Sequence, residues 1–579
     1  MTSTDEQAAD VHVIPALHGL DEQGDPLSLE GWGWTVRPEA GEAKRLAIAS
    51  LVNLEAPAPV AGITYVSHGN VLVVAGRDAA RARESASKLA TGLHVTLLGE
   101  GTVAPVEGCT AWSGRIETLE GYLGEFSATL ASLNGAAGAK AKFDLVLDFS
   151  QPPLFAMHQP PQGYYRAPAE ALALESVLAE LKEAVGEFEK PKYFAYRENL
   201  CAHARSGITG CTACIDICST SAIAAKGDHV EVDAHLCMGC GACATVCPSG
   251  AMGYQFPRPA DRGAQLKQLL AAYRHAGGAD ACILFHNGTD GRDALAASAA
   301  RGQGLPGRVI PLETWHVAAI GPDLLLSAVA FGASQVAVLC AGSESPDYVR
   351  ALREEMDFAQ SIVSALGYAG VHFALVQAPA GVGLEAGLEA LAPAATVREA
   401  GTFMVSNDKR TAIEFAVEHL LRNAPQRREV IALAPGAAYG EVVVDREKCT
   451  LCLACAGACP ESALMDGVDQ PMLRFLERNC VQCGLCEKTC PEDAITLNPR
   501  LLLTPAVREA RVLNETKPFH CVLCAKPFGT LQMVNTMLGR LATHSMFSTP
   551  EAQRRLQMCA DCRVVDMMSN KNEASVLKL

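Results

Sequence analysis

The sequence is poor in aromatic side chains and has no excess of positive charge. Phe, Trp and Tyr make up 6% of its 579 residues, and 48 Lys and Arg stand against 64 Asp and Glu, which gives a formal net charge of -16. Such an acidic surface would repel a phosphate backbone, so nucleic acid is not an expected partner. Apolar residues at 49% and charged residues at 19% are ordinary for a folded globular protein.

The sequence also has little that would direct it to a membrane. The start, MTSTDEQAAD, lacks the basic and apolar regions of a secretory signal, so we expect a cytoplasmic location. The stretch 324–343 is free of charge over roughly the length of a membrane span. Because Gly332 and Gln335 interrupt it, we expect a helix that ends at Gly332, then a buried strand QVAVLC, and no membrane span.

Convincing motifs of catalysis are absent as well. We find no Walker loop, nucleophile elbow or molybdopterin-enzyme signature. After the expected strand NVLVVAG, Gly76 stands alone where a nicotinamide-binding turn would place three glycines. A non-catalytic chain is therefore favoured, while a flavin or NAD(P) site in this segment stays open as an alternative.

Cysteine, in contrast, is abundant, with 23 residues. A reducing compartment does not support a disulfide framework, so clustered thiols indicate metal or redox chemistry. Three cysteines fall outside the clusters and lie among small or apolar residues, where we expect them to be buried and without function: Cys109, Cys282 and Cys340.

The most regular cluster fits C-x2-C-x2-C-x3-C-P without deviation and consists of Cys237, Cys240, Cys243 and Cys247. Three thiols with this spacing converge on one cubane cluster, whereas the fourth points to a second cluster. A second group must therefore lie nearby, and four cysteines just upstream supply it: Cys201, Cys211, Cys214 and Cys218.

The same pattern returns twice later in the chain. These groups are Cys449, Cys452, Cys455 and Cys459, and Cys480, Cys483, Cys486 and Cys490, each followed by proline. A zinc site needs four thiolates but has no use for a third cysteine at i+6 and a fourth at i+10 followed by proline, repeated in tandem, so iron-sulfur clusters are favoured. The apolar ends of the following runs PSGAM, PESAL and PEDAI are expected to begin helices that cover the clusters.

Both cysteine-rich segments resemble bacterial ferredoxins with two [4Fe-4S] clusters, in which each motif completes the cluster of the other. The resemblance implies four clusters, held by four sets of cysteines. Set A is Cys218, Cys237, Cys240 and Cys243; set B is Cys201, Cys211, Cys214 and Cys247; set C is Cys459, Cys480, Cys483 and Cys486; set D is Cys449, Cys452, Cys455 and Cys490.

The first segment departs from this pattern in two places. Nine residues separate Cys201 from Cys211 where the motif has two, and Ser219 follows Cys218 where the motif has proline. A longer loop adds little closure entropy, so Cys201 remains the expected ligand. If it is not a ligand, the cluster is a three-iron form or uses His203.

Two further pairs of cysteines lie near the C-terminus. Cys521 and Cys524 are separated from Cys559 and Cys562 by 34 residues, which we expect to form two helices that double back. A four-cysteine zinc site is the favoured interpretation, ahead of an additional iron-sulfur cluster and a dithiol redox pair.

The predicted fold is a multidomain α/β chain. Strands alternate with helices in the middle segment and indicate a parallel sheet, which separates two α+β ferredoxin modules. The expected divisions are an N-terminal segment 1–60, an α/β domain 61–165, a linker helix 166–192 that is apolar at positions 177 to 188, ferredoxin module 193–258, α/β domain 259–425, ferredoxin module 426–502, and a small helical cysteine-rich domain 503–579.

Two broader resemblances suggest a function. The run LLLSAVAFGASQVAVLCAGSESPDYVRALR is similar to the small α/β subunit of hydrogenase and heterodisulfide-reductase complexes, and the overall plan resembles iron-sulfur proteins that accompany bacterial formate dehydrogenases. These resemblances imply electron transfer to or from a larger oxidoreductase. A maturation factor for a metalloenzyme is a further alternative.

Overall fold

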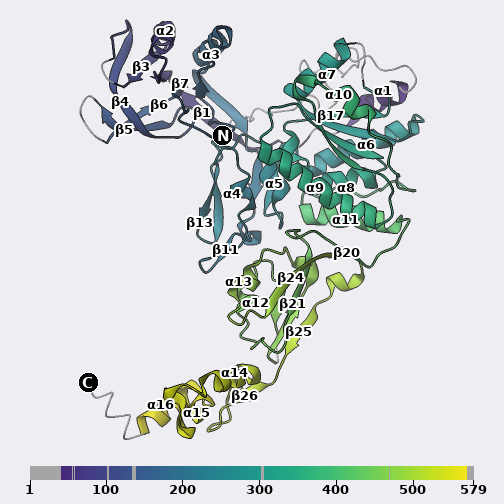
Figure 1. The fold of residues 1–579 in the computed structure, drawn as a ribbon. Coiled ribbons are helices and arrows are strands. Elements are labelled where there is room, and N and C mark those ends of the chain that lie inside the picture. The colour runs from purple at the N-terminus through teal and green to yellow at the C-terminus, as the bar shows by residue number, and fades with distance from the viewer. Residues whose placement is uncertain are drawn as a thin grey trace, which may run out of the picture.

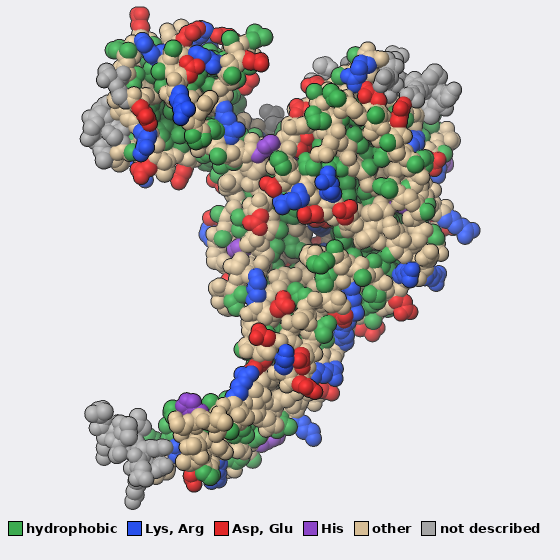
Figure 2. Space-filling model, in the orientation of Figure 1, with side chains coloured by type: hydrophobic (Ala, Val, Ile, Leu, Met, Phe, Trp, Pro, Cys, Tyr) green, Lys and Arg blue, Asp and Glu red, His purple; other side chains and the backbone are tan. Residues whose placement is uncertain are grey.

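The computed structural model describes residues 41–569 except 55, 56, 58, 101, 102, 134–137, 302–304, 468 and 469. Most of the expected N-terminal segment 1–60 therefore lies outside the described residues. The N-terminal and middle α/β domains stand apart from each other, and the first ferredoxin module lies between and below them (Figure 1). The second module and the C-terminal domain extend away from this group (Figure 2).

The N-terminal domain is built on a seven-stranded mixed sheet in the order β6-β5-β4-β3-β2-β7-β8. The predicted strand-helix-strand unit is confirmed as β2 (Asn70–Val74), α2 (Ala79–Leu89) and β3 (His94–Gly99). The remaining strands are β4 (Cys109–Glu120), β5 (Phe126–Leu133), β6 (Ala139–Phe143), β7 (Leu145–Asp148) and β8 (Tyr164–Arg166). The antiparallel strands β5 and β6 extend this sheet beyond its parallel part.

The predicted linker helix is partly wrong. α3 (Ala171–Glu183) ends early, and β9 (Gly186–Pro191) follows it and pairs antiparallel with β1 (Gly62–Ser67). Gly186 has a φ of +128°, which allows the chain to leave the helix. The apolar residues after α3 therefore continue into a strand, whereas Leu174, Leu178 and Leu181 bury α3 against the sheet.

The middle domain has the predicted parallel sheet, in the order β17-β16-β18-β19. Its strands are β16 (Cys282–Asn287), β17 (Val309–Thr314), β18 (Gln335–Cys340) and β19 (Phe373–Gln377). Its helices are α6 (Pro259–His275), α7 (Asp290–Ala300), α8 (Pro322–Ala330), α9 (Pro346–Ala365), α10 (Leu384–Glu389) and α11 (Lys409–Arg422).

The uncharged stretch 324–343 folds as expected into a helix and a strand. α8 precedes Gly332, whose φ is +106°, and β18 forms a central, fully buried strand of the sheet. Among the residues that the structure describes, no helix has the length and apolar character needed to cross a membrane.

An N-terminal helix, α1 (Gly41–Ala49), packs on the middle domain rather than on the sheet that follows it in the chain. Ala43, Ala47 and Leu51 join the same core as α6 and α8. The Lys44 ammonium is 1% exposed and donates to the carbonyl of Pro306 at 2.9 Å. Burial lowers the pKa of Lys44 to about 7.

The two ferredoxin modules share one plan, in which a pair of terminal strands and an inner hairpin enclose the cysteines. In the first module these are β10 (Phe194–Tyr196) with β15 (Met252–Tyr254), and β13 (Ile223–Lys226) with β14 (His229–Val232). In the second they are β21 (Gly440–Val444) with β24 (Ile495–Leu502), and β22 (Leu464–Asp466) with β23 (Met472–Phe475). β20 (Val430–Ala432) and β25 (Arg511–Glu515) widen the second module.

The expectation that helices begin after each fourth cysteine is wrong, because Met252, Leu464 and Ile495 begin strands. Short helices instead lie between the second and fourth cysteines of each motif. They are α4 (Ala213–Asp216), α5 (Ala242–Val246), α12 (Ala454–Ala458) and α13 (Leu485–Thr489).

The C-terminal domain combines a hairpin with three helices. β26 (Pro518–His520) pairs with β27 (Pro527–Thr530), and α14 (Leu531–Leu541), α15 (Pro550–Leu556) and α16 (Ala560–Ser569) follow. The predicted helix start at Thr549 is confirmed, because its hydroxyl accepts a hydrogen bond from the Ala552 N–H.

Candidate metal centres

Tight turns shape the three regular cysteine motifs. Gly239 and Gly241 in the first module have φ values of +77° each. In the second module, Leu451, Leu453 and Gln482 occupy equivalent turns with φ values of +55°, +62° and +52°. Side chains rarely adopt this region, and such strain is concentrated at binding sites. The turns hold backbone N–H groups close to the thiols, as those of Gly239 and Gln482 show for the preceding cysteines.

The structure groups twelve of the cysteines around three cavities of nearly equal size. Each cavity has a volume of about 20 Å³, and the three are lined by set B, set C and set D respectively. Each cavity thus has four thiols, three of which come from one motif or loop and one from the partner motif of the same module. Three similar cavities, each lined by four cysteine thiols, fit three copies of the same metal cluster.

Hydrogen-bond donors reach the fourth cysteine of three motifs. The N–H groups of Ala463 and Ala494 lie 3.3 and 3.4 Å from the sulfurs of Cys459 and Cys490. The Met252 N–H lies 3.5 Å from the sulfur of Cys247. Such donors stabilise negative charge on thiolate sulfurs, so the donor set fits the iron-sulfur cluster that the motifs imply.

Set A is enclosed by the middle domain. Cys240 and Cys243 contact a buried apolar cluster that contains Tyr348 and Ala351 of α9. Burial is the main cause that raises the pKa of Cys240 to about 11, and the thiols of Cys218 and Cys237 raise the pKa of Cys240 and Cys243 further. The same causes raise the pKa of Cys455 in set D to about 12. Binding of iron to such protonated thiols would release protons.

The nine-residue insertion before Cys211 forms a small hairpin, β11 (Ala204–Arg205) and β12 (Ile208–Thr209). The Cys211 N–H donates to the Ala202 carbonyl at 2.9 Å, so the hairpin returns the chain to its starting point. Cys201 lines the cavity of set B and is 7% exposed. His203 lines the same cavity, with its Nδ1 2.9 Å from the Cys211 carbonyl. Ligation by Cys201 stays a prediction.

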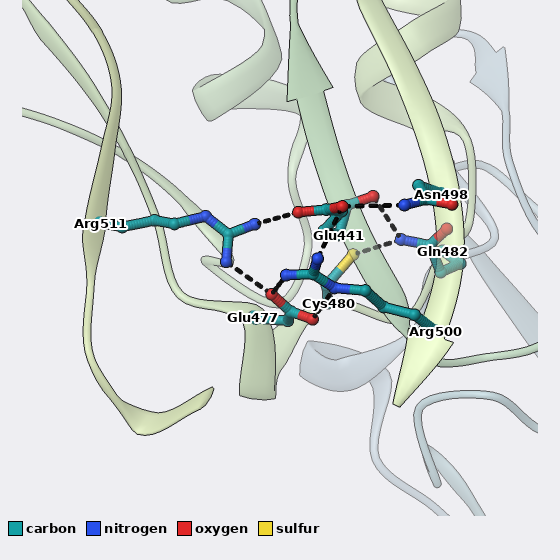
Figure 3. A network of polar contacts seen from close by, with 7 residues as sticks. All are labelled: Glu441, Glu477, Cys480, Gln482, Asn498, Arg500 and Arg511. Atoms are coloured by element: carbon teal, nitrogen blue, oxygen red, sulfur yellow. Dashed lines mark hydrogen bonds and ion pairs between the residues drawn. The ribbon is translucent and has the colours of Figure 1, made fainter. Parts of the chain in front are cut away.

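A polar network borders set C (Figure 3). Glu477 accepts hydrogen bonds from the guanidinium groups of Arg500 and Arg511, and Arg511 also reaches Glu441 at 2.8 Å. Burial alone would raise the pKa of Glu477. The hydrogen bonds and positive charges of Arg500 and Arg511 outweigh this effect and lower the pKa. Gln482 donates from Nε2 to the Cys480 sulfur at 3.2 Å (Figure 3). Sequence reasoning missed Gln482, because its role depends on the strained turn.

The four C-terminal cysteines are brought together, as predicted. The sulfurs of Cys521, Cys524, Cys559 and Cys562 all lie within 4.8 Å of one another, and those of Cys524 and Cys559 are 3.7 Å apart. A tetrahedral ion with Zn–S bonds of about 2.3 Å would separate its sulfurs by about 3.8 Å. The site therefore fits a single metal ion better than a larger cluster.

The backbone around this site favours the thiolate form of Cys521, whereas side-chain hydrogen bonds with Cys524 and Cys559 raise the pKa of Cys562 to about 12. Although burial opposes the effect, the N–H groups of Cys524 and Cys559 lower the pKa of Cys521 to about 6. Deprotonated sulfur is the form that binds a metal ion.

The remaining cysteines are dispersed. Cys282 and Cys340 are buried at opposite ends of the neighbouring strands β16 and β18. Cys109 is half-buried, and its thiol lies 3.5 Å from the Ala86 carbonyl.

Two family models match the chain, and both are described as a 4Fe-4S dicluster domain. The first covers residues 209–251 and the second covers residues 448–495. These matches contain all the cysteines of sets A to D except Cys201, and they show two ferredoxin-type domains, which supports a role in iron-sulfur electron transfer.

A curated protein, Hydrogenase-4 component A of Escherichia coli (strain K12), is 38% identical over 52 residues. The similarity covers 9% of this chain and 25% of that protein. The similarity leaves most of both chains unmatched.

Proposed function

We propose that this protein passes single electrons to or from a larger oxidoreductase through four [4Fe-4S] clusters arranged in one line. The proposed ligands are the cysteines of sets A to D. When bound, such clusters supply reversible one-electron exchange. The order A, B, C, D is supported by the contacts between neighbouring sets.

Within each module, two sets approach each other closely. The Cys214 thiol of set B is among the neighbouring charges that raise the pKa of Cys243 in set A, after burial itself. In the second module, Cys455 of set D acts in the same way on Cys486 of set C, again after burial. Each module thus brings its two sets within range of electrostatic interaction.

The contact between modules carries the proposal. Burial raises the pKa of Cys483 in set C to about 11, and the neighbouring charges that add to this include Cys211 of set B. Lys488 donates to the Thr209 carbonyl at 2.7 Å, and Gly210 packs against the Leu485 side chain. The two modules are separated by a whole domain in sequence, yet the hairpin of β11 and β12 lies beside α13 (Figure 1).

The line has one exposed end. Cys452 of set D is exposed, whereas set A is covered by α9. The C-terminal domain contacts the set D loop, because the Thr530 hydroxyl donates to the Thr450 carbonyl at 2.7 Å. We therefore assign partner docking to the rim around Cys452 and a structural role, with zinc as the expected ion, to the C-terminal site.

The partner is proposed from resemblance. The E. coli relative is named as a component of a hydrogenase, and the domain plan of this chain resembles proteins that accompany formate dehydrogenase. Both point to a subunit of a redox complex, with formate dehydrogenase as the first candidate and the cytoplasm as the proposed location.

The alternative of a flavin or NAD(P) enzyme has less support. At the carboxyl ends of β2 and β7, Asp148 already accepts hydrogen bonds from Ser150, Leu154 and Tyr164. A Cβ on Gly76 would lie 2.1 Å from the Phe149 carbonyl, so this edge is filled by the chain itself. A packing role for the N-terminal domain is favoured.

Reductive titration of the anaerobically purified full chain tests the proposal. We expect the uptake of about four electrons per chain and their full return to a one-electron acceptor, without NAD(P)H oxidation. Uptake of two electrons or fewer would contradict the four-cluster relay. A flavin released on denaturation would favour the enzymatic alternative, and loss of cofactor from a partner enzyme, with electron flow intact, would favour the maturation factor.

A further inference from the structure

Tyr348 links the middle domain to set A. It lies in the first turn of α9, is 1% exposed, and its hydroxyl donates to the Cys240 sulfur at 3.1 Å. The two residues are 108 positions apart in the sequence. A side chain from a separate domain therefore places a hydrogen-bond donor on a cysteine of the proposed cluster.

The same hydroxyl meets Ser219, the residue that stands where the other three motifs have proline. The hydroxyls of Ser219 and Tyr348 are in direct hydrogen-bond contact, and the Ser219 hydroxyl also has the Gln159 Oε1 as an acceptor at 3.2 Å. Each hydroxyl has one proton. The Ser219 proton can go to the Gln159 oxygen or to the tyrosine oxygen. In the second arrangement the proton of Tyr348 goes to Cys240, and this is how the serine would orient the tyrosine toward sulfur.

This arrangement gives the departure from the proline pattern a physical reason. Proline at position 219 would have no hydroxyl to offer to Tyr348. The cysteine that precedes it, Cys218, also belongs to set A, and its sulfur lies 3.5 Å from the Thr220 hydroxyl. Two of the four sulfurs of this set thus each lie within reach of one hydroxyl group.

We propose that Tyr348, oriented by Ser219, is a positioning residue that raises the reduction potential of the cluster held by set A. Reduction adds negative charge to the cluster and its cysteine sulfurs, and a donor at one sulfur stabilises the reduced form more than the oxidised form. The middle domain thereby sets the potential at the covered end of the line. This inference rests on the proposed function, because it requires a cluster at set A.

The chain offers a matched control for the loss of this hydroxyl. Tyr254 is also buried beside set A, but its hydroxyl donates to the Gly239 carbonyl at 2.8 Å rather than to a sulfur. Tyr348→Phe and Tyr254→Phe therefore remove the same atom at similar depth. They differ in whether a sulfur loses its donor.

The test is a redox titration of the full-length chain that is monitored by electron paramagnetic resonance. Resonance Raman spectra of the iron-sulfur stretches are the second measurement. In Tyr348→Phe we expect the equilibrium constant for reduction of one cluster to fall by up to about tenfold. This corresponds to a reduction potential that is lower by up to about 59 mV for a one-electron couple. One iron-thiolate stretch should shift as well. Ser219→Ala should change both in the same direction by less, and Tyr254→Phe should change neither.

Equal potentials in Tyr348→Phe and the unsubstituted protein, with full iron content in both, would overturn the inference. Equal shifts in Tyr348→Phe and Tyr254→Phe would do the same, because they would indicate a general effect of packing. If Tyr348→Phe loses iron, Ser219→Ala decides, and an unchanged potential there would reject the role of this pair. A low iron content of the unsubstituted chain would instead contradict the proposed function.

Discussion

The Lys488 ammonium of the second module donates to the Thr209 carbonyl of the first at 2.7 Å, across 279 positions of sequence. This bond joins α13 to the small hairpin that precedes Cys211. The insertion before Cys211 is therefore more than a tolerated loop, because it forms the surface on which the two modules meet.

A first prediction concerns this contact. A Cβ on Gly210 would lie 2.6 Å from the Ala202 carbonyl and 2.8 Å from the Leu485 side chain, so Gly210→Ala together with Lys488→Ala should separate the modules. Electron equilibration between the modules after flash reduction should slow several-fold. Lys448→Ala, at an exposed lysine of the second module, serves as the control. Unchanged equilibration with full iron content would show that electrons do not cross at this contact.

A second prediction concerns Cys201. Cys201→Ser should convert the cluster of set B to a three-iron form or remove it, because one of the four thiols around that cavity is lost. Iron analysis should fall from about 16 per chain by between about one and four. Cys282→Ser, at a buried cysteine outside the sets, should leave iron unchanged. Full iron content in Cys201→Ser would instead implicate another ligand, with His203 the first to test.

A third prediction separates the C-terminal site from the clusters. Cys524→Ser should abolish binding of about one zinc per chain, since the four sulfurs lie within 4.8 Å of one another, and iron content should not change. Metal analysis of the purified chain measures both quantities, and Cys109→Ser is the matched control. Loss of iron with Cys524→Ser would mean that an iron-sulfur cluster occupies this site.

A fourth prediction follows from Lys44. Its pKa falls from 10.5 in the unfolded chain to about 7 in the folded chain, so the unfolded state binds more protons between these values. Stability of α1 against the middle domain should therefore rise with pH in this window. Lys44→Met should be the more stable form at pH 7, and its advantage should shrink by about 1.4 kcal/mol per pH unit above that.

Amide hydrogen exchange in α1 and α6, corrected for the intrinsic effect of pH, measures this difference. Lys448→Met, at an exposed position, should show no such trend. An advantage of Lys44→Met that is the same at pH 7 and pH 10 would be incompatible with a buried, neutral lysine.

The grouping of the cysteines follows from local spacing, which is why most of it could be predicted. Three thiols at intervals of three residues converge through one turn, and the fourth must turn away. The same holds for the parallel sheet of the middle domain, whose strands QVAVLC and HFALVQ are continuous apolar runs.

Features that depend on distant partners could not be predicted. The sequence predicts that Phe188 ends an amphipathic helix. In the structure this segment pairs with β1 and forms the strand β9. Tyr348 reads as an ordinary core residue of α9, and its contact with Cys240 depends on how the domains pack. Ser219 was the one local signal, as a serine where the motif has proline, and its meaning required the structure.

The account depends most on a continuous line of clusters across both modules, and magnetic coupling in the fully reduced full-length protein tests this directly. We expect the electron paramagnetic resonance spectrum to show coupling between modules that disappears in Cys483→Ala, where the cluster of set C is lost. Cys282→Ala should retain the coupling. A spectrum of the unsubstituted protein that equals the sum of two separate two-cluster spectra would contradict the line.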